Sequence, residues 1–128
     1  MQYLKTYLKK ITDRGNTKLA ESIEKTANDV GNKHIKTFSF SSHEIGLLLG
    51  NVQSGKTGQM FGIICKAADL GFPVFVLLTT DNVVLQQQTL DRVRADLEGF
   101  CICGENDAAL FAENNLMDPV SYTHLRAH

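Results

Sequence analysis

Eight consecutive residues have the types and spacing needed to bind phosphate. They fit the pattern GxxxxGK(S/T), and they are Gly50, Asn51, Val52, Gln53, Ser54, Gly55, Lys56 and Thr57. Glycines let the backbone approach a ligand closely, so that successive N–H groups can surround an anion. The lysine ammonium suits the β and γ phosphates, where it would act in catalysis, and the threonine hydroxyl suits Mg²⁺. The pattern therefore predicts a nucleoside-triphosphate site with ATP and Mg²⁺ as cofactors; the alternative is a glycine-rich turn without a ligand.

A second group of polar residues follows the apolar run 74–78. Thr79 and Thr80 come directly after this run, and Gln88 closes a row of three amides in the next predicted helix. In an open α/β sheet, ligands bind beyond the carboxyl ends of the strands, so we expect both threonines on the rim that holds the phosphate. Short hydroxyls and amides contact nucleic-acid backbones without reading sequence. Thr79, Thr80 and Gln88 are therefore candidate DNA contacts, although a capped helix with a solvated polar face explains them equally simply.

The cysteines and histidines indicate no further chemistry. Cys101 and Cys103 alternate along a short apolar segment, but a zinc site takes four ligands and no other Cys or His lies near them in the sequence. Cys65 falls among apolar residues of a predicted helix and is expected in the core. His34 and His43 are expected to be solvated loop residues.

The elements around the phosphate-binding pattern alternate between strand and helix. Short apolar runs at 44–49, 74–78 and 100–103 predict buried strands. Apolar spacing predicts helices at about 56–70 and 83–98, the second with Leu90, Val93 and Leu97 on its buried face. Strand–helix alternation is typical of a parallel sheet covered by helices. We therefore expect an α/β fold, a three-layer P-loop NTPase with an incomplete parallel sheet.

A helical segment with a polar connector precedes this unit, over residues 1–43. Apolar residues at helical spacing predict one helix near the N-terminus, with Leu4 and Ile11 on its buried face. A second helix is predicted to begin after Asn16 as its N-cap and to stop at Gly31.

Three segments of the sequence resemble one family. They are Gly46–Thr57 with its VQSGKT core, Gly62–Phe72 with its KAAD-x-G-F helix end, and Leu85–Thr89. The chain is similar over residues 44–98 to the Z-one domain proteins, helicase-like bacterial proteins described as endonucleases. The resemblance implies a RecA-like ATPase domain of the superfamily-two helicase type, related to restriction and phage-defence motors. It gives Lys56 and Thr57 the phosphate and Mg²⁺ roles and implies that Thr79, Thr80, Leu85 and Gln88 belong to a DNA-contacting motif.

The composition favours an ordinary globular protein. The chain has 128 residues, 43% of them hydrophobic, a net charge of -1 and three cysteines. It has no apolar run of roughly 18 residues and no apolar core of a signal peptide near its N-terminus. We therefore expect no membrane partner, reduced thiols and a cytoplasmic location.

The last nine residues resemble a translated laboratory DNA sequence and not natural protein. Val120–His128, read back into codons, resembles the translated transposon-end adapter of sequencing libraries, and Pro119 can belong to it. We therefore divide the chain into the helical segment 1–43, a partial P-loop ATPase domain at 44–118 and an adapter-derived artefact at 119–128. The acidic Mg²⁺ motif, the second RecA-like lobe with its arginine and the nuclease domain would then be missing.

Taken together, these features predict the nucleotide-binding N-terminal fragment of an ATP-dependent DNA translocase or helicase coupled to an endonuclease. Duplex DNA is the expected partner of the intact protein, which we expect to hydrolyse ATP, whereas the fragment would at most bind nucleotide weakly. The alternatives are a nucleotide-dependent switch module and a small-molecule or nucleoside kinase that shares only the phosphate-binding loop.

Overall fold

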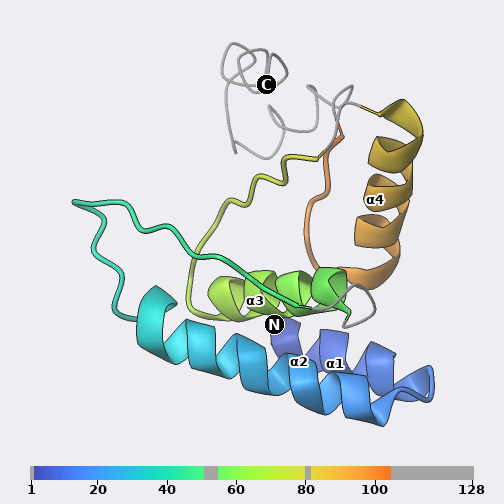
Figure 1. The fold of residues 1–128 in the computed structure, drawn as a ribbon, viewed down its shortest axis with the longest axis horizontal. Coiled ribbons are helices and arrows are strands. Elements are labelled where there is room, and N and C mark those ends of the chain that lie inside the picture. Colours follow the sequence, from blue (N-terminus) through green and yellow to red (C-terminus); the bar gives the residue numbers. More distant parts are fainter. Residues whose placement is uncertain (1, 51–54, 80–81, 105–128) are drawn as a thin grey trace. The chain divides into compact units, whose positions relative to one another are not determined.

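The computed structural model describes residues 2–50, 55–79 and 82–104 (Figure 1). In order along the chain, the elements are α1 (Tyr3–Asp13), α2 (Thr17–Val30), a π-helical turn η1 (Gly31–Ile35), α3 (Lys56–Asp69) and α4 (Val83–Asp96). The chain separates into two compact units, residues 1–73 and 74–128. The first unit holds α1, α2, η1 and α3, and the second holds α4.

The core of the first unit lies between α1, α2 and α3, each of which packs against the other two. Apolar residues recur every three or four positions on each helix, so that each helix turns one apolar stripe towards the others. The buried apolar side chains are Leu4, Tyr7 and Ile11 of α1, Ala20, Ile23 and Ala27 of α2, and Phe61, Cys65 and Ala67 of α3. The four α-helices predicted from apolar spacing are thus confirmed, with their ends shifted by a few residues.

Two glycines of α3 allow it to approach α2 closely. A Cβ atom at Gly62 would overlap Cγ2 of Ile23, and one at Gly58 would lie 3.2 Å from Cδ1 of the same isoleucine. Beside this contact, the rings of Tyr7 and Phe61 meet edge to face, with their centroids 6.2 Å apart. The first unit therefore depends on small residues on α3 as much as on large ones.

The beginning of α1 is capped by the end of α3. One carboxylate oxygen of Asp69 accepts a hydrogen bond of 2.7 Å from the Tyr3 N–H, and the other accepts one of 3.1 Å from the Leu4 N–H. The N-cap residue Gln2 makes no side-chain cap, and the first turn of α1 contains no acidic residue. Asp69 thus supplies the negative charge and the acceptors that the start of a helix needs.

The predicted end of the second α-helix is confirmed, because α2 ends at Val30 with Gly31 as its C-cap, but the chain does not reverse there. Gly31 has right-handed helical angles (φ -59°, ψ -48°), and the chain continues through η1 to Ile35. A Cβ atom at Gly31 would clash with the Lys66 side chain, so this glycine serves close packing and not chain reversal. His34, expected in a loop, lies on η1.

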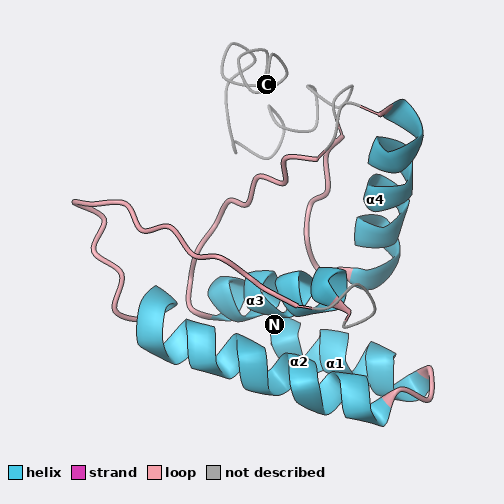
Figure 2. Cartoon of the chain, viewed as in Figure 1, coloured by secondary structure: helices cyan, strands magenta, loops and turns pink. Residues whose placement is uncertain are grey.

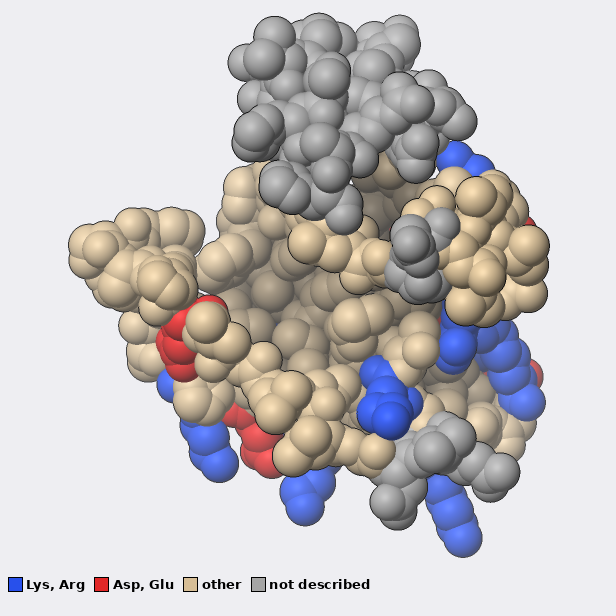
Figure 3. Space-filling model, turned by 45° about the horizontal axis from the view of Figure 1, so that its top comes forward, with Lys and Arg blue, Asp and Glu red and all other residues tan. Residues whose placement is uncertain are grey.

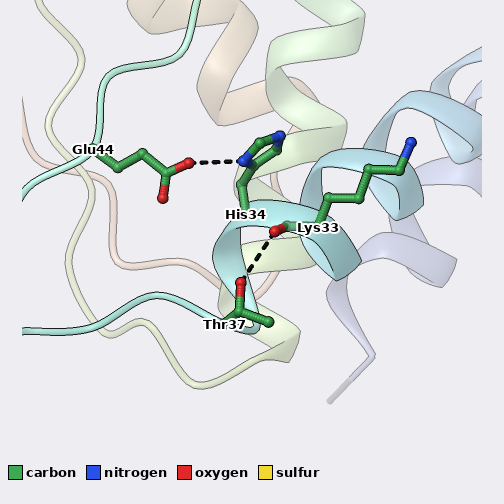
Figure 4. Close-up of polar contacts among 4 residues, drawn as sticks. All are labelled: Lys33, His34, Thr37 and Glu44. Atoms are coloured by element: carbon green, nitrogen blue, oxygen red, sulfur yellow. Dashed lines mark hydrogen bonds and ion pairs between the residues drawn. The ribbon is translucent and has the colours of Figure 1, made fainter.

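The connector after η1 is held by polar contacts that Figure 4 shows. The Thr37 hydroxyl donates to the Lys33 carbonyl oxygen at 3.0 Å, and Nδ1 of His34 lies 2.7 Å from a Glu44 carboxylate oxygen. The second contact ties η1 to the segment that leads to Gly50. All residues from 41 to 50 are nevertheless exposed.

The second unit contains α4 and the segments beside it. The Asn82 side chain caps this helix by accepting a hydrogen bond of 3.1 Å from the Leu85 N–H. Val93 and Leu97, two residues of the predicted apolar face, are buried, and Leu90 is half-buried. Phe75 and Phe100 meet edge to face, with centroids 6.0 Å apart.

The expected α/β fold is wrong. Residues 2–50, 55–79 and 82–104 contain no β-strand, so the described chain is a small all-helical fold and not a three-layer P-loop NTPase of the RecA-like type (Figure 2). The apolar runs 44–49, 74–78 and 100–103 have no regular secondary structure. A buried strand needs hydrogen-bond partners at its edges and cover on both faces. Ile45 and Leu47 have no such cover, since 86% and 82% of their surfaces are exposed.

Candidate phosphate-binding site

The structure describes the two ends of the predicted phosphate-binding loop. Gly50 lies at one end, and Gly55, Lys56 and Thr57 lie at the other, where α3 begins. The predicted ligands Asn51, Val52, Gln53 and Ser54 lie outside the described residues. The described part of the site comprises the two glycines and the first turn of α3, which begins with the lysine and the threonine.

Gly55 makes the sharp turn into α3. Its backbone is left-handed (φ 71°, ψ 38°), a conformation that L side chains rarely adopt. A Cβ atom there would also lie only 2.9 Å from Cδ1 of Leu19 on α2. The left-handed backbone therefore favours glycine strongly at the position that the motif assigns to it, and the close approach of Leu19 adds to this preference.

The start of α3 offers hydrogen-bond donors. The Gln59 N–H donates to the Gly55 carbonyl oxygen at 3.0 Å and begins the helical ladder, so the N–H groups of Lys56, Thr57 and Gly58 have no partner within the helix. The helix dipole places roughly half a positive charge at this end. No acidic residue lies in the first turn of α3 to offset it. An anion is the ligand that these donors favour.

Lys56 reaches back across the loop. Its Nζ donates a hydrogen bond of 3.1 Å to the carbonyl oxygen of Gly50, and its side chain is exposed. The lysine thus joins the first residue of the pattern to the beginning of the helix. Its partner is a neutral oxygen, which a phosphate oxygen can replace because hydrogen bonds to ionised acceptors are stronger.

Gln59 is a residue of this region that the sequence did not single out. It is buried, its Nε2 donates to Oγ of Ser22 at 3.0 Å, and its Oε1 has no hydrogen-bond partner. The contact fixes the first turn of α3 on α2. The signal that could have found Gln59 is its place between Gly58 and Gly62, which mark the face of α3 that meets α2.

The candidate DNA contacts belong to the second unit. Thr79 and Gln88 are exposed, and Thr80 lies outside the described residues. Because residues 74–79 form no strand, the expectation that the threonines follow a strand on the rim of a sheet is wrong. Within α4, Nε2 of Gln87 donates to Asp91 at 2.8 Å, and the Thr89 hydroxyl donates to the Leu85 carbonyl oxygen at 2.9 Å. The polar face of α4 is thus partly engaged in its own hydrogen bonds.

The charges on the surface are mixed. Most of the described surface visible in Figure 3 belongs to uncharged residues, with Lys and Arg side chains around it singly or in small groups. On α1, Nζ of Lys9 lies 2.7 Å from the Asp13 carboxylate, and this hydrogen bond and charge raise the pKa of Lys9. One of the basic residues of the N-terminal segment is therefore already paired with an acid.

No protein-family model matches the chain, and no curated protein or solved structure matches it. Among the helices of the described residues, none has the length and apolar character needed to cross a bilayer.

Proposed function

We propose that Gly50–Thr57 and the start of α3 bind the phosphates of a nucleoside triphosphate together with Mg²⁺. The observation that carries the proposal is the turn at Gly55. A left-handed glycine leads directly into a helix whose first two residues are Lys56 and Thr57, and the lysine Nζ lies 3.1 Å from the Gly50 carbonyl oxygen. This arrangement supports phosphate binding without requiring the sheet that the sequence predicted.

Each described group has a distinct part in this proposal. The unpaired N–H groups and the dipole of α3 stabilise the negative charge of the phosphates. The Lys56 ammonium exchanges its neutral carbonyl partner for a phosphate oxygen, and the Thr57 hydroxyl is a ligand for Mg²⁺. Gln59, through Ser22, keeps the first turn of α3 in place. The chain's own residues thus bind and orient the phosphates.

Titration of the chain with a fluorescent ATP analogue, with and without Mg²⁺, tests the proposal. Lys56→Ala is expected to weaken binding at least about tenfold, because it removes a charge-assisted hydrogen bond. Lys25→Ala removes the same charge from an exposed position on α2 and is the matched control. Equal affinity of the Lys56→Ala variant and the unaltered chain would contradict the proposal, provided that far-UV circular dichroism shows the same helix content.

We further propose that nucleotide binding by this chain serves DNA translocation by the intact protein. The resemblance of the sequence to helicase-like proteins supports this part of the proposal. On this proposal the chain binds Mg²⁺–ATP without turnover, since the acidic pair and the arginine of a motor are not among its recognised motifs. Turnover is measured as phosphate release with and without duplex DNA. Phosphate transfer to a nucleoside would favour the kinase alternative instead.

DNA contact is tested separately, through the second unit. Fluorescence anisotropy of a labelled duplex measures binding with and without Mg²⁺–ATP, and Thr79→Ala and Gln88→Ala are each expected to weaken it modestly, because each removes one backbone contact. Binding that is unchanged in both variants would remove the DNA role from these residues. That result would not bear on the proposed phosphate-binding site.

A further inference from the structure

Two cysteines of the second unit lie side by side. In the segment after α4, Sγ of Cys101 and Sγ of Cys103 are 3.8 Å apart. One end of this segment is anchored, because the Phe100 ring packs against Phe75. Both sulfurs are present as thiols. The structure therefore places two thiols within reach of a bond of about 2.05 Å after a small local movement.

The three cysteines of the chain differ in their access to solvent. Cys101 is exposed and Cys103 is half-buried, whereas only 1% of the surface of Cys65 is exposed. Burial, with a smaller contribution from the Asp69 carboxylate, raises the pKa of Cys65 to about 12. Cys65 is therefore protonated and inaccessible near neutral pH, while the thiol pair can meet a reagent in solution.

A metal site is the less suitable interpretation of this pair. Within residues 2–50, 55–79 and 82–104, no group of three or more His, Cys, Asp or Glu side chains could hold a metal ion. A structural zinc site takes four ligands. Two thiols alone are suited to thiol–disulfide exchange.

We propose that Cys101 and Cys103 are a reversible redox pair that forms an intramolecular disulfide in exchange with a low-molecular-weight disulfide of the glutathione class. This site is independent of the phosphate-binding proposal. Cys101 is the attacking residue because it is the more exposed of the two, and Cys103 is the resolving residue.

The exchange proceeds in two balanced steps. The Cys101 thiolate attacks one sulfur of the small disulfide, whose S–S bond breaks and releases one thiolate, leaving a mixed disulfide on Cys101. The Cys103 thiolate then attacks Sγ of Cys101 and expels the second thiolate. The two protons of the cysteines pass through solvent to the two released thiolates. The protein is oxidised by two electrons, and one small disulfide is reduced to two thiols.

The second step is fast because it is intramolecular. The resolving thiol is 3.8 Å away, so its effective concentration exceeds that of a second small thiol in solution. The bond would enclose only Ile102 and would include the exposed Cys101, so a small thiol can reach the bond and reduce it. The pair is therefore suited to reversible oxidation and not to permanent cross-linking.

Mass spectrometry of the full chain after incubation with mixtures of reduced and oxidised glutathione tests this proposal. After an acid quench and alkylation, trypsin separates the thiols, because Cys65 falls on Thr57–Lys66 and the pair falls on Ala95–Arg126. The second peptide is expected to lose two hydrogen atoms and to escape alkylation, with little glutathione adduct. Cys103→Ser is expected to accumulate the adduct on Cys101, at least about tenfold above the unaltered chain, because nothing resolves it.

The matched variant Cys101→Ser tests the order of attack. It is expected to form its adduct on Cys103 more slowly than Cys103→Ser forms one on Cys101, because Cys103 is less exposed. Cys65 should be alkylated only in denaturant, which checks that the chain is folded. Equal amounts of glutathione adduct in the unaltered chain and in Cys103→Ser would overturn the proposal. A disulfide that forms only between two chains would also overturn it.

Discussion

The helical core of the first unit and the apolar segment 45–49 both contain large apolar residues, but they differ in burial. Ile23 of α2 is completely buried between its neighbours, whereas 86% of the surface of Ile45 is exposed. Leu47 and Leu49, with 82% and 80% exposed, resemble Ile45 and not the leucines of a core. Apolar composition therefore does not decide burial in this chain.

The difference lies in what each pattern needs from the rest of the chain. A helix satisfies its own backbone hydrogen bonds and has one apolar stripe to cover, and α1, α2 and α3 cover each other's stripes. An apolar extended run needs hydrogen-bond partners beside it and cover on two faces. The described residues meet the needs of the helices, but they do not cover the apolar extended run. The stability of the chain is therefore expected to come from the helices.

Truncation of the core should have the largest effect. Phe61→Ala removes a fully buried ring that meets Tyr7 edge to face, and it is expected to lower the free energy of unfolding by about 3–5 kcal/mol. Urea denaturation followed by circular dichroism at 222 nm measures the loss. A change below about 1 kcal/mol would mean that the three helices do not form a packed core.

Filling the close contact between α2 and α3 should have the next largest effect. Gly62→Ala places a Cβ atom where it would overlap Ile23, and it is expected to cost about 1–3 kcal/mol although alanine favours helices. Gly46→Ala is the control, because nothing lies within 4 Å of a Cβ atom there. Equal stability of the two variants in urea would show that the helices stand further apart.

Removal of the cap on α1 should have a smaller effect. Asp69→Ala deletes the acceptors of the Tyr3 and Leu4 N–H groups and is expected to cost about 1 kcal/mol. Asp13→Ala breaks only the exposed pair with Lys9, for which a clearly smaller loss is expected because water screens exposed charges. Thermal unfolding of both variants compares them, and an equal loss would contradict the capping role.

A change in the exposed segment should have the smallest effect. Leu47→Gln replaces an exposed apolar side chain, and the free energy of unfolding is expected to stay within about 0.5 kcal/mol of that of the unaltered chain. The same urea titration provides the measurement. A loss of 2 kcal/mol or more, comparable with a core residue, would place Leu47 in a buried environment and remove the contrast with Ile23.

Prediction from the sequence succeeded for the helices and failed for the sheet. The spacing of Leu4 and Ile11 in α1 and of Val93 and Leu97 in α4 is local information, and both helices formed where it indicated. The runs at 44–49 and 74–78 predict strands because short apolar runs are typical of buried strands. Such a run specifies no partner, and pairing depends on residues far away in the chain. The close contact of Gly31 with Lys66 was not predicted for a related reason, since it joins positions far apart in the sequence.

The candidate phosphate-binding site was likewise predicted only in part from the sequence. The spacing of Gly50, Gly55, Lys56 and Thr57 predicted a glycine turn at the start of a helix, and the structure has this turn at Gly55. The roles of Gln59 and Ser22 in holding that turn were not visible, because they lie 37 positions apart. The distance between the Cys101 and Cys103 sulfurs is likewise set by the tertiary structure, since alternation along the chain alone does not fix where side chains meet.

By itself, the sequence determined the four α-helices and the glycine that leads into α3, because helical periodicity and backbone freedom act over a few neighbouring residues. The tertiary structure alone decided that the apolar run at 45–49 stays exposed, that Asp69 caps α1, and that two glycines of α3 contact one isoleucine of α2. These features join positions that are distant along the chain, so they follow from the packing of whole helices against one another and from no local pattern.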